Sequence, residues 1–277
     1  SSAQSPEQRP KPVPPRPMFL SSHSPRSTAV ILAALLFGAD LAFAQQIVDV
    51  IRNDISLPED VDAGNAKPAD IDGDGDIDFV IQDFAIVPGA SFGHRIVWAR
   101  NDGGGDWTVL PISNAEETYS DFPFDVADMD NDGDLDVVTG SFGQSFSITG
   151  WDLGQGAALR VHTNNGQGSF TQTTILETNF FNQLFTGAKY IVGVTTADLD
   201  RDRDLDIIVL QGSSVSRIAW IPNNGDGTYG GVQVIWQEDG LNPRGVDTGD
   251  VDGDGDIDVV VSTTPRRLDN VGEIICM

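Results

Sequence analysis

The feature that most constrains the fold of this chain is an acidic nonapeptide that occurs four times. It reads DIDGDGDID at 70–78, DMDNDGDLD at 128–136, DLDRDRDLD at 198–206 and DVDGDGDID at 250–258. Each copy has an aspartate at every odd position and runs directly into a β-branched segment such as FVI or VVV. Closely spaced like charges repel one another, so the fold has to supply something that neutralises them.

A second motif follows three of the copies and is rich in asparagine and glycine. It reads NDGGGDW at 101–107, NNGQGSF at 164–170 and NNGDGTY at 223–229. Asn-Gly and Gly-rich pairs tolerate positive φ and close tight hairpins. One unit is therefore strand, acidic loop, strand, connection, strand, Asn-Gly turn, strand.

The spacing of the units predicts the fold class. Successive acidic copies are 58, 70 and 52 residues apart (128 − 70, 198 − 128 and 250 − 198), with no helical period between them. Four short strands at such a repeat length are typical of one antiparallel blade of a β-propeller. The uninterrupted apolar runs after each acidic loop favour strands packed between neighbouring blades over strands with one wet face. We therefore expect an all-β propeller with about four blades.

The acidic copies are predicted to bind calcium, which accepts six to eight oxygen ligands. Counted from the first aspartate, positions 1, 3, 5 and 9 offer side chains, position 7 offers its backbone carbonyl, and glycine at position 6 allows the sharp turn. This gives up to four ions, with the following residues as ligands: Asp70, Asp72, Asp74, Asp76 and Asp78; Asp128, Asp130, Asp132, Asp134 and Asp136; Asp198, Asp200, Asp202, Asp204 and Asp206; Asp250, Asp252, Asp254, Asp256 and Asp258.

Two other interpretations of these loops are solvated acidic turns and EF-hands. Solvated acidic turns would explain a single loop, but four copies in register favour a metal. An EF-hand needs a bidentate glutamate at position 12 and flanking helices. Position 12 is instead Ile81, Thr139, Val209 or Val261, and the flanks are strand-like.

The third loop is predicted to be the weakest site. Its position 6 is Arg203 rather than glycine, and Arg201 adds a second positive charge. Residues other than glycine tolerate the left-handed conformation poorly. We expect lower calcium affinity there, or partial replacement of the ion by internal salt bridges.

The pattern resembles the FG-GAP/VCBS-type repeat, which is also used in the integrin α-subunit propeller. The residues that carry the resemblance are ADIDGDGDIDFVI, ADMDNDGDLDVV, ADLDRDRDLDIIV and GDVDGDGDIDVVV, with the NNGDGTY-type turn downstream. The resemblance implies a propeller, usually of seven blades, with calcium in the hairpin between the first two strands of a blade. It also implies a role in adhesion, ligand binding or carbohydrate recognition.

The chain departs from that pattern in length. Seven blades of about 60 residues need roughly 420 residues, whereas residues 45–277 number 233. We expect a fragment of a larger ring. A four-bladed ring and a ring completed by a second chain are the alternatives.

The amino terminus is predicted to carry processing signals. Residues 1–17 are Pro-rich and expected to be disordered. Residues 18–44 have a basic start, an apolar stretch and an Ala-Phe-Ala site, which indicates a signal peptide cleaved after Ala44. Asp40 interrupts the apolar run, which argues against a membrane anchor. The repeat domain would then be 45–277, secreted, on the cell surface or in the periplasm, with no transmembrane span after cleavage.

The net charge and the residues outside the acidic loops limit the classes of function that the chain can have. The formal charge of −26 disfavours nucleic acid and anionic membranes, which bind proteins through Lys and Arg. His94 and His162 show no ligand spacing, and no nucleophile motif is present. We expect a non-enzymatic calcium-binding module that binds or adheres to a protein or carbohydrate ligand. The alternatives are the non-catalytic scaffold of a secreted polysaccharide-active enzyme and a purely structural surface repeat.

Overall fold

The computed structural model describes residues 55, 57–58, 61–84, 95–113, 121–141, 145–147, 150–152, 157–178, 188–213, 215–239, 241–265 and 274–277. The chain divides into two units, residues 1–52 and 53–277, and every described residue belongs to the second. The predicted disordered segment and signal peptide therefore lie outside the described residues and stay predictions. The described residues include no helix that is long and apolar enough to cross a membrane.

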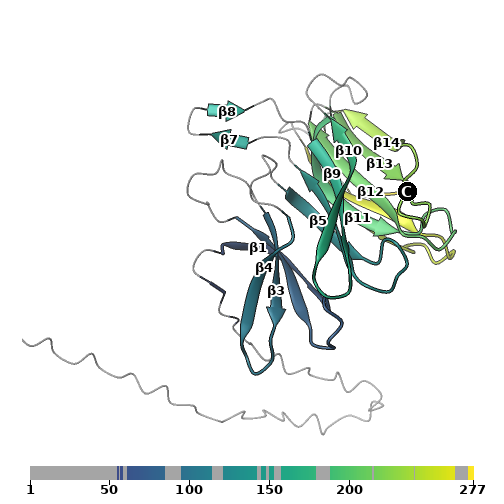
Figure 1. Ribbon diagram of the computed structural model, residues 1–277. Coiled ribbons are helices and arrows are strands. Elements are labelled where there is room, and N and C mark those ends of the chain that lie inside the picture. Colours follow the sequence, from purple (N-terminus) through teal and green to yellow (C-terminus); the bar gives the residue numbers. More distant parts are fainter. Residues whose placement is uncertain are drawn as a thin grey trace, which may run out of the picture. The chain divides into compact units, whose positions relative to one another are not determined.

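The described elements are all strands, which form four antiparallel sheets in chain order and one small hairpin (Figure 1). We call the sheets blades 1 to 4. Blade 1 has β1 (Ala63–Ala69), β2 (Asp78–Asp83), β3 (Arg95–Asn101) and β4 (Trp107–Pro111); blade 2 has β5 (Asp121–Ala127), β6 (Asp136–Ser141), β9 (Ala157–Asn164) and β10 (Phe170–Thr178); blade 3 has β11 (Ala188–Ala197), β12 (Asp206–Ser213), β13 (Val215–Ile221) and β14 (Gln233–Asp239); blade 4 has β15 (Leu241–Gly249), β16 (Asp258–Pro265) and β17 (Ile274–Cys276). The predicted all-β propeller of four antiparallel blades is confirmed.

Blade 2 contains an insertion that the sequence did not reveal. Between β6 and β9 the chain forms a separate two-stranded hairpin, β7 (Ser145–Ser147) and β8 (Gly150–Asp152). The third strand of this blade therefore pairs with β6 across the insertion. The hairpin accounts for the longest step between acidic copies, the 70 residues from 128 to 198.

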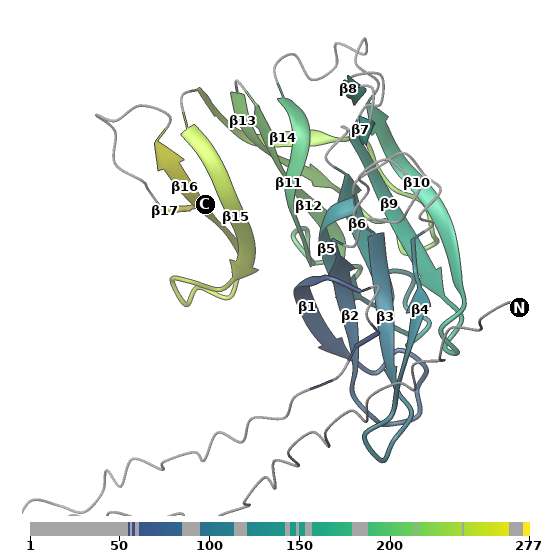
Figure 2. The same ribbon diagram turned by 90° about the vertical axis from the view of Figure 1, so that its left-hand side faces the viewer.

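The blades pack face to face (Figure 2), and the second strands of blades 1 to 3 are buried on both sides, whereas one side of β16 in blade 4 is half-buried or exposed. In β12, Ile207 and Val209 belong to the core between blades 2 and 3, whereas Ile208 and Leu210 belong to the core between blades 3 and 4. Because side chains alternate along a strand, an unbroken apolar run serves two cores at once. Each of these buried side chains contributes about 1.5 to 3 kcal/mol.

The core between blades 1 and 2 follows the same plan. Val80, Ile96 and Trp98 of blade 1 pack against Phe124 and Val137 of blade 2. Trp98 is 1% exposed, so this tryptophan is a packing residue.

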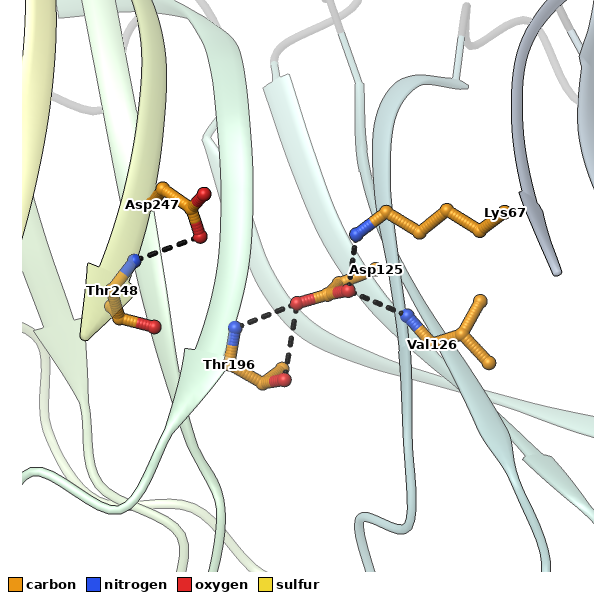
Figure 3. A network of polar contacts seen from close by, with 6 residues as sticks. All are labelled: Lys67, Asp125, Val126, Thr196, Asp247 and Thr248. Atoms are coloured by element: carbon orange, nitrogen blue, oxygen red, sulfur yellow. Dashed lines mark hydrogen bonds and ion pairs between the residues drawn. The ribbon is translucent and has the colours of Figure 1, made fainter. Parts of the chain in front are cut away.

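The first strands of blades 1 to 3 are joined by a polar network centred on Asp125 (Figure 3). The Lys67 ammonium of β1 forms an ion pair with Asp125 of β5. The other oxygen of Asp125 accepts hydrogen bonds from the backbone N–H of Thr196 in β11 at 2.8 Å and from its hydroxyl at 3.1 Å. The buried carboxylate of Asp125 therefore ties three blades together.

Candidate metal centres

Each acidic loop joins the first strand of a blade to the second. In the first three loops the carboxylates at positions 1, 3 and 9 come together, with one oxygen of each residue within 4.8 Å of the others. The fourth loop brings together positions 1, 3 and 5. The clusters are Asp70, Asp72 and Asp78; Asp128, Asp130 and Asp136; Asp198, Asp200 and Asp206; Asp250, Asp252 and Asp254.

The first three clusters hold buried oxygens that have no hydrogen-bond partner in the described part of the chain. They are Oδ1 of the aspartate at position 1, together with Oδ1 of Asp72 in the first loop; the position-1 residues are Asp70, Asp128 and Asp198. A buried carboxylate oxygen without a partner is costly. A cation inside the cluster would satisfy these oxygens, so the donor set fits a hard divalent ion.

The second oxygen of each position-1 aspartate shapes the loop. Oδ2 of Asp128 accepts a hydrogen bond from the backbone N–H of Gly133 at 3.0 Å, and the same bond recurs at 3.1 Å from Gly75 to Asp70. One oxygen therefore folds the loop while the other stays available inside the cluster.

The aspartate at position 9 is a structural anchor as well as a cluster member. Asp136 accepts hydrogen bonds from the backbone N–H of Met129 in its own loop and of Asn164 at the end of β9, both at 2.8 Å. Asp78 and Asp206 repeat this arrangement in blades 1 and 3. This residue pins the loop to the third strand of its blade.

The side chains at positions 5 and 7 make further contacts in the first three loops. Asp132 lies outside its cluster and accepts a hydrogen bond from the backbone N–H of Asp134 at 2.9 Å, as Asp74 and Asp202 do in theirs. At position 7, the side chain of Asp134 lies against the Asn-Gly turn of its blade. A Cβ on Gly166 would lie 2.4 Å from that carboxylate, and Gly166 has φ +71°, so the turn requires glycine.

Each loop needs the left-handed conformation twice, at positions 4 and 6. Position 6 has φ between +83° and +94° in all four loops, as predicted, and position 4 has φ between +60° and +79°, which the sequence did not reveal. In the third loop both positions are arginines, Arg201 with φ +66° and Arg203 with φ +83°. Arg201 lies against Asp256 of the fourth loop, so its ion pair is made between loops.

Replacing Arg203 by glycine is expected to stabilise the chain by about 1 kcal/mol, because a side chain in the left-handed region costs about that much. The reciprocal change, Gly133→Arg, should destabilise it by a similar amount, since Gly133 has φ +94° and nothing lies within 4 Å of its added Cβ. Urea unfolding of both variants and the parent measures this. A less stable Arg203→Gly variant would contradict the strain argument.

The fourth loop departs most from the others. Both oxygens of Asp250 accept backbone hydrogen bonds, from Gly253 at 2.7 Å and Gly255 at 3.2 Å. All members of its cluster are exposed. The third loop, predicted to be the weakest, has the same convergence and the same unpartnered oxygen as the first two. The order of affinities stays a prediction.

The close packing of carboxylates shifts the pKa of several aspartates in the clusters. Loss of hydration raises the pKa of Asp72, Asp130 and Asp200, and neighbouring carboxylates raise it further. Burial raises the pKa of Asp136 to about 6, although its two backbone hydrogen bonds act in the opposite direction. Without a cation, the folded chain therefore holds these carboxylates in an unfavourable charged state at neutral pH.

The part of the stability that depends on calcium is expected to fall by about half or more between pH 7 and pH 5. The folded pKa of Asp136 is raised, so in the calcium-free chain its contribution to stability is present below the unfolded value of 3.8 and is lost as pH rises through about 6. Calcium needs the ionised form, so protons compete with it in that window. Melting temperatures of calcium-free and calcium-loaded chain at pH 7, 6 and 5 measure the difference. An unchanged difference at pH 5 would argue against these shifts.

The residues considered for other chemistry do not form a second centre in the described part of the chain. His94 lies outside the described residues. His162 is buried and bonds Thr139 Oγ1 through Nε2 at 3.1 Å. Burial, helped by the positive charge of Arg160, lowers the pKa of His162 to about 4. It is a neutral core residue at physiological pH.

Comparison with known proteins identifies the repeat. The sequence profile of the FG-GAP-like repeat matches residues 70–139, 148–209 and 198–261, which include all four acidic loops. The chain belongs to the FG-GAP-like repeat family. The predicted resemblance is confirmed.

Two rhamnogalacturonan lyases are among the solved structures that match part of this chain. The exotype lyase YesX has a TM-score of 0.44 and 16% identity, over 71% of this chain and 38% of that one. The lyase YesW has a TM-score of 0.42 and 16% identity, over 76% and 41%. This chain thus spans about two fifths of the length of each lyase. No protein with a curated description matches it.

Proposed function

We propose that this chain is an exported calcium-binding repeat protein whose propeller acts as a binding or adhesion module for a protein or carbohydrate ligand. The observation that carries the calcium part is the convergence of carboxylates around buried, unpartnered oxygens in three successive loops. In this proposal the ions are held by the clusters at Asp70, Asp128 and Asp198, with the exposed cluster at Asp250 as a fourth site.

The chemistry of the clusters favours calcium over other metals. Every member is a carboxylate, with no cysteine or histidine among them. Hard oxygen donors suit calcium, magnesium or manganese, whereas zinc and copper prefer nitrogen and sulfur. Calcium tolerates irregular sets of six to eight ligands, while magnesium demands a near-ideal octahedron. Loops of this length with several acids suit the larger ion.

The proposal that the chain binds a protein or carbohydrate ligand depends on the propeller blades as a scaffold for loops. Rigid blades present loops whose shape would be fixed by the ions, and loops on a rigid frame are where binding residues concentrate. The predicted signal peptide at 18–44 supports an extracellular setting. Modules of that setting function with calcium dissociation constants as weak as about 10⁻⁴ to 10⁻³ M.

The test is a calorimetric titration of the chain, with calcium and magnesium in separate runs. Binding of about three to four calcium ions per chain is expected, lost stepwise when Asp72, Asp130 and Asp200 are changed to asparagine. Absence of calcium binding at 5 mM would overturn the metal part. Glycan arrays and extracellular-protein arrays, each with and without calcium, then test the ligand. Calcium-dependent capture supports the binding module, and its absence leaves the scaffold or purely structural role.

A further inference from the structure

Two buried asparagines occupy the same place in successive blades. Asn164 is the last residue of β9, and Asn223 follows β13 after one residue. They are 2% and 1% exposed. Both begin the Asn-Gly turns, where the sequence indicated only a hairpin.

Each of these side chains bonds two acidic loops at once. Asn164 Nδ2 donates to the carbonyl of Ile71 in the first loop at 2.7 Å and to that of Leu135 in the second at 3.2 Å. Asn223 Nδ2 donates to the carbonyl of Met129 in the second loop at 2.7 Å and to that of Leu205 in the third at 3.1 Å. The bonds to the preceding loop span 93 and 94 residues of sequence.

The same asparagines also bond the metal clusters. The backbone N–H of Asn164 donates to Asp136 at 2.8 Å, and that of Asn223 donates to Asp206 at 2.9 Å. The other oxygen of Asp136 accepts from Met129, whose carbonyl is the one that Asn223 holds. An unbroken series of hydrogen bonds therefore runs from the first loop through Asn164 and Asp136 to Met129, and on through Asn223 to Asp206.

A second contact links the loops on their exposed side. The side-chain amide of Asn131, at position 4 of the second loop, donates to the carboxylate of Asp204, at position 7 of the third, at 2.6 Å. Arg201, at position 4 of the third loop, lies against Asp256, at position 7 of the fourth. The pairing of position 4 with position 7 of the next loop joins the second loop to the third and the third to the fourth, and Asn164 joins the first to the second, so all four loops are joined in series.

We propose that these links make calcium binding cooperative between neighbouring blades, with Asn164 and Asn223 as the positioning residues of the coupling. This rests on the proposed function, since it needs the clusters to bind calcium. An ion that draws the carboxylates of one loop together fixes Asp136 or Asp206, and with it the asparagine and the peptide of the preceding loop. The neighbour then loses less conformational freedom when its own ion binds. Such coupling is reciprocal between sites.

Blade 1 supplies the matched control. Asn101 stands at the same place as Asn164 and Asn223, and its backbone N–H donates to Asp78 at 2.8 Å. Its side-chain bonds are local, to the carbonyl of Ile77 at 3.4 Å and from the N–H of Gly103 at 3.1 Å. Replacing Asn101 therefore removes the turn contacts without touching a bond between loops.

The experiment is a calcium titration by competition with a chromophoric chelator, using the full chain. Asp72→Asn, which disables the first loop, is expected to weaken calcium binding at the remaining loops by about fivefold or more. Asn164→Ala should weaken calcium binding at the remaining loops by a similar factor. In the Asn164→Ala background, Asp72→Asn should cause no further loss of calcium affinity at those loops. Asn101→Ala should behave as the parent does, with a Hill coefficient above 1.

The outcomes separate this inference from the proposed function. If the parent binds no calcium, the proposed function is overturned and the coupling with it. If calcium binds, but Asp72→Asn only removes one site and leaves the affinity of the others within twofold of the parent, the coupling alone is overturned. That arm alters no buried asparagine, so it decides the question even if Asn164→Ala fails to fold.

Discussion

Removing calcium from the purified chain is expected to lower its melting temperature by about 15 °C or more. At a free calcium concentration 100 times the dissociation constant, each occupied site stabilises the folded state by about 2.7 kcal/mol. For a chain of this size, 1 kcal/mol shifts the melting temperature by about 2 to 4 °C. The three clusters with unpartnered oxygens together give the expected shift. Thermal melts followed by circular dichroism in 5 mM calcium and in excess EDTA measure it.

The matched control carries Asp72→Asn, Asp130→Asn and Asp200→Asn together. These changes remove one carboxylate from each of the three clusters, and loss of Asp130 also removes part of the repulsion that raises the pKa of Asp136. The triple variant should melt at nearly the same temperature with and without calcium. Identical melting curves of the parent chain in calcium and in EDTA would contradict the prediction.

Replacing Asp136 by alanine is expected to destabilise the fold by about 2 to 6 kcal/mol, because it leaves two buried backbone N–H groups without an acceptor. These are the N–H groups of Met129 and Asn164, which Asp136 now accepts at 2.8 Å. Both bonds are internal to the protein, so the loss should persist in EDTA. Urea unfolding with and without calcium measures it.

Asp258 is the control for that substitution. It stands at the same position in the fourth loop but is only half-buried, and it accepts from the exposed N–H of Val251 at 2.9 Å. Asp258→Ala should cost about 1 kcal/mol or less, since water replaces an acceptor at an exposed group. Equal losses at Asp136 and Asp258 would show that burial of the anchor does not matter.

Much of the fold could be predicted from local sequence because the same pattern of strands and turns occurs in several units, and each occurrence supports the assignment of the others. The apolar runs at 79–81 and 207–210 have to be covered on both faces, and stacked sheets do this. The β7–β8 hairpin could not be predicted, because it occurs in one unit and has no counterpart among the described strands of the others. Its only sign in the sequence is the long step of 70 residues between the second and third acidic copies.

The residue types of the candidate site could be predicted from the sequence, but the structural role of each individual aspartate could not. Five aspartates per loop look equivalent in sequence, yet Asp136 is an anchor, Asp130 a cluster member and Asp132 a loop-forming residue. The role of Asp136 depends on its contact with Asn164 at the end of β9, which lies far along the chain. The bond from Asn164 to Ile71 spans 93 residues, and no local pattern reports such a distance.

The place of the anchoring aspartate has a consequence for strand alignment. Asp78, Asp136 and Asp206 are the first residues of β2, β6 and β12, the strands with two apolar faces. A one-residue slip in such a strand would exchange one hydrophobic face for another, so hydrophobicity alone hardly penalises it. The slip would, however, pull a fully buried carboxylate away from both of its donors. The same aspartate that belongs to the carboxylate cluster therefore also fixes the register of the sheet.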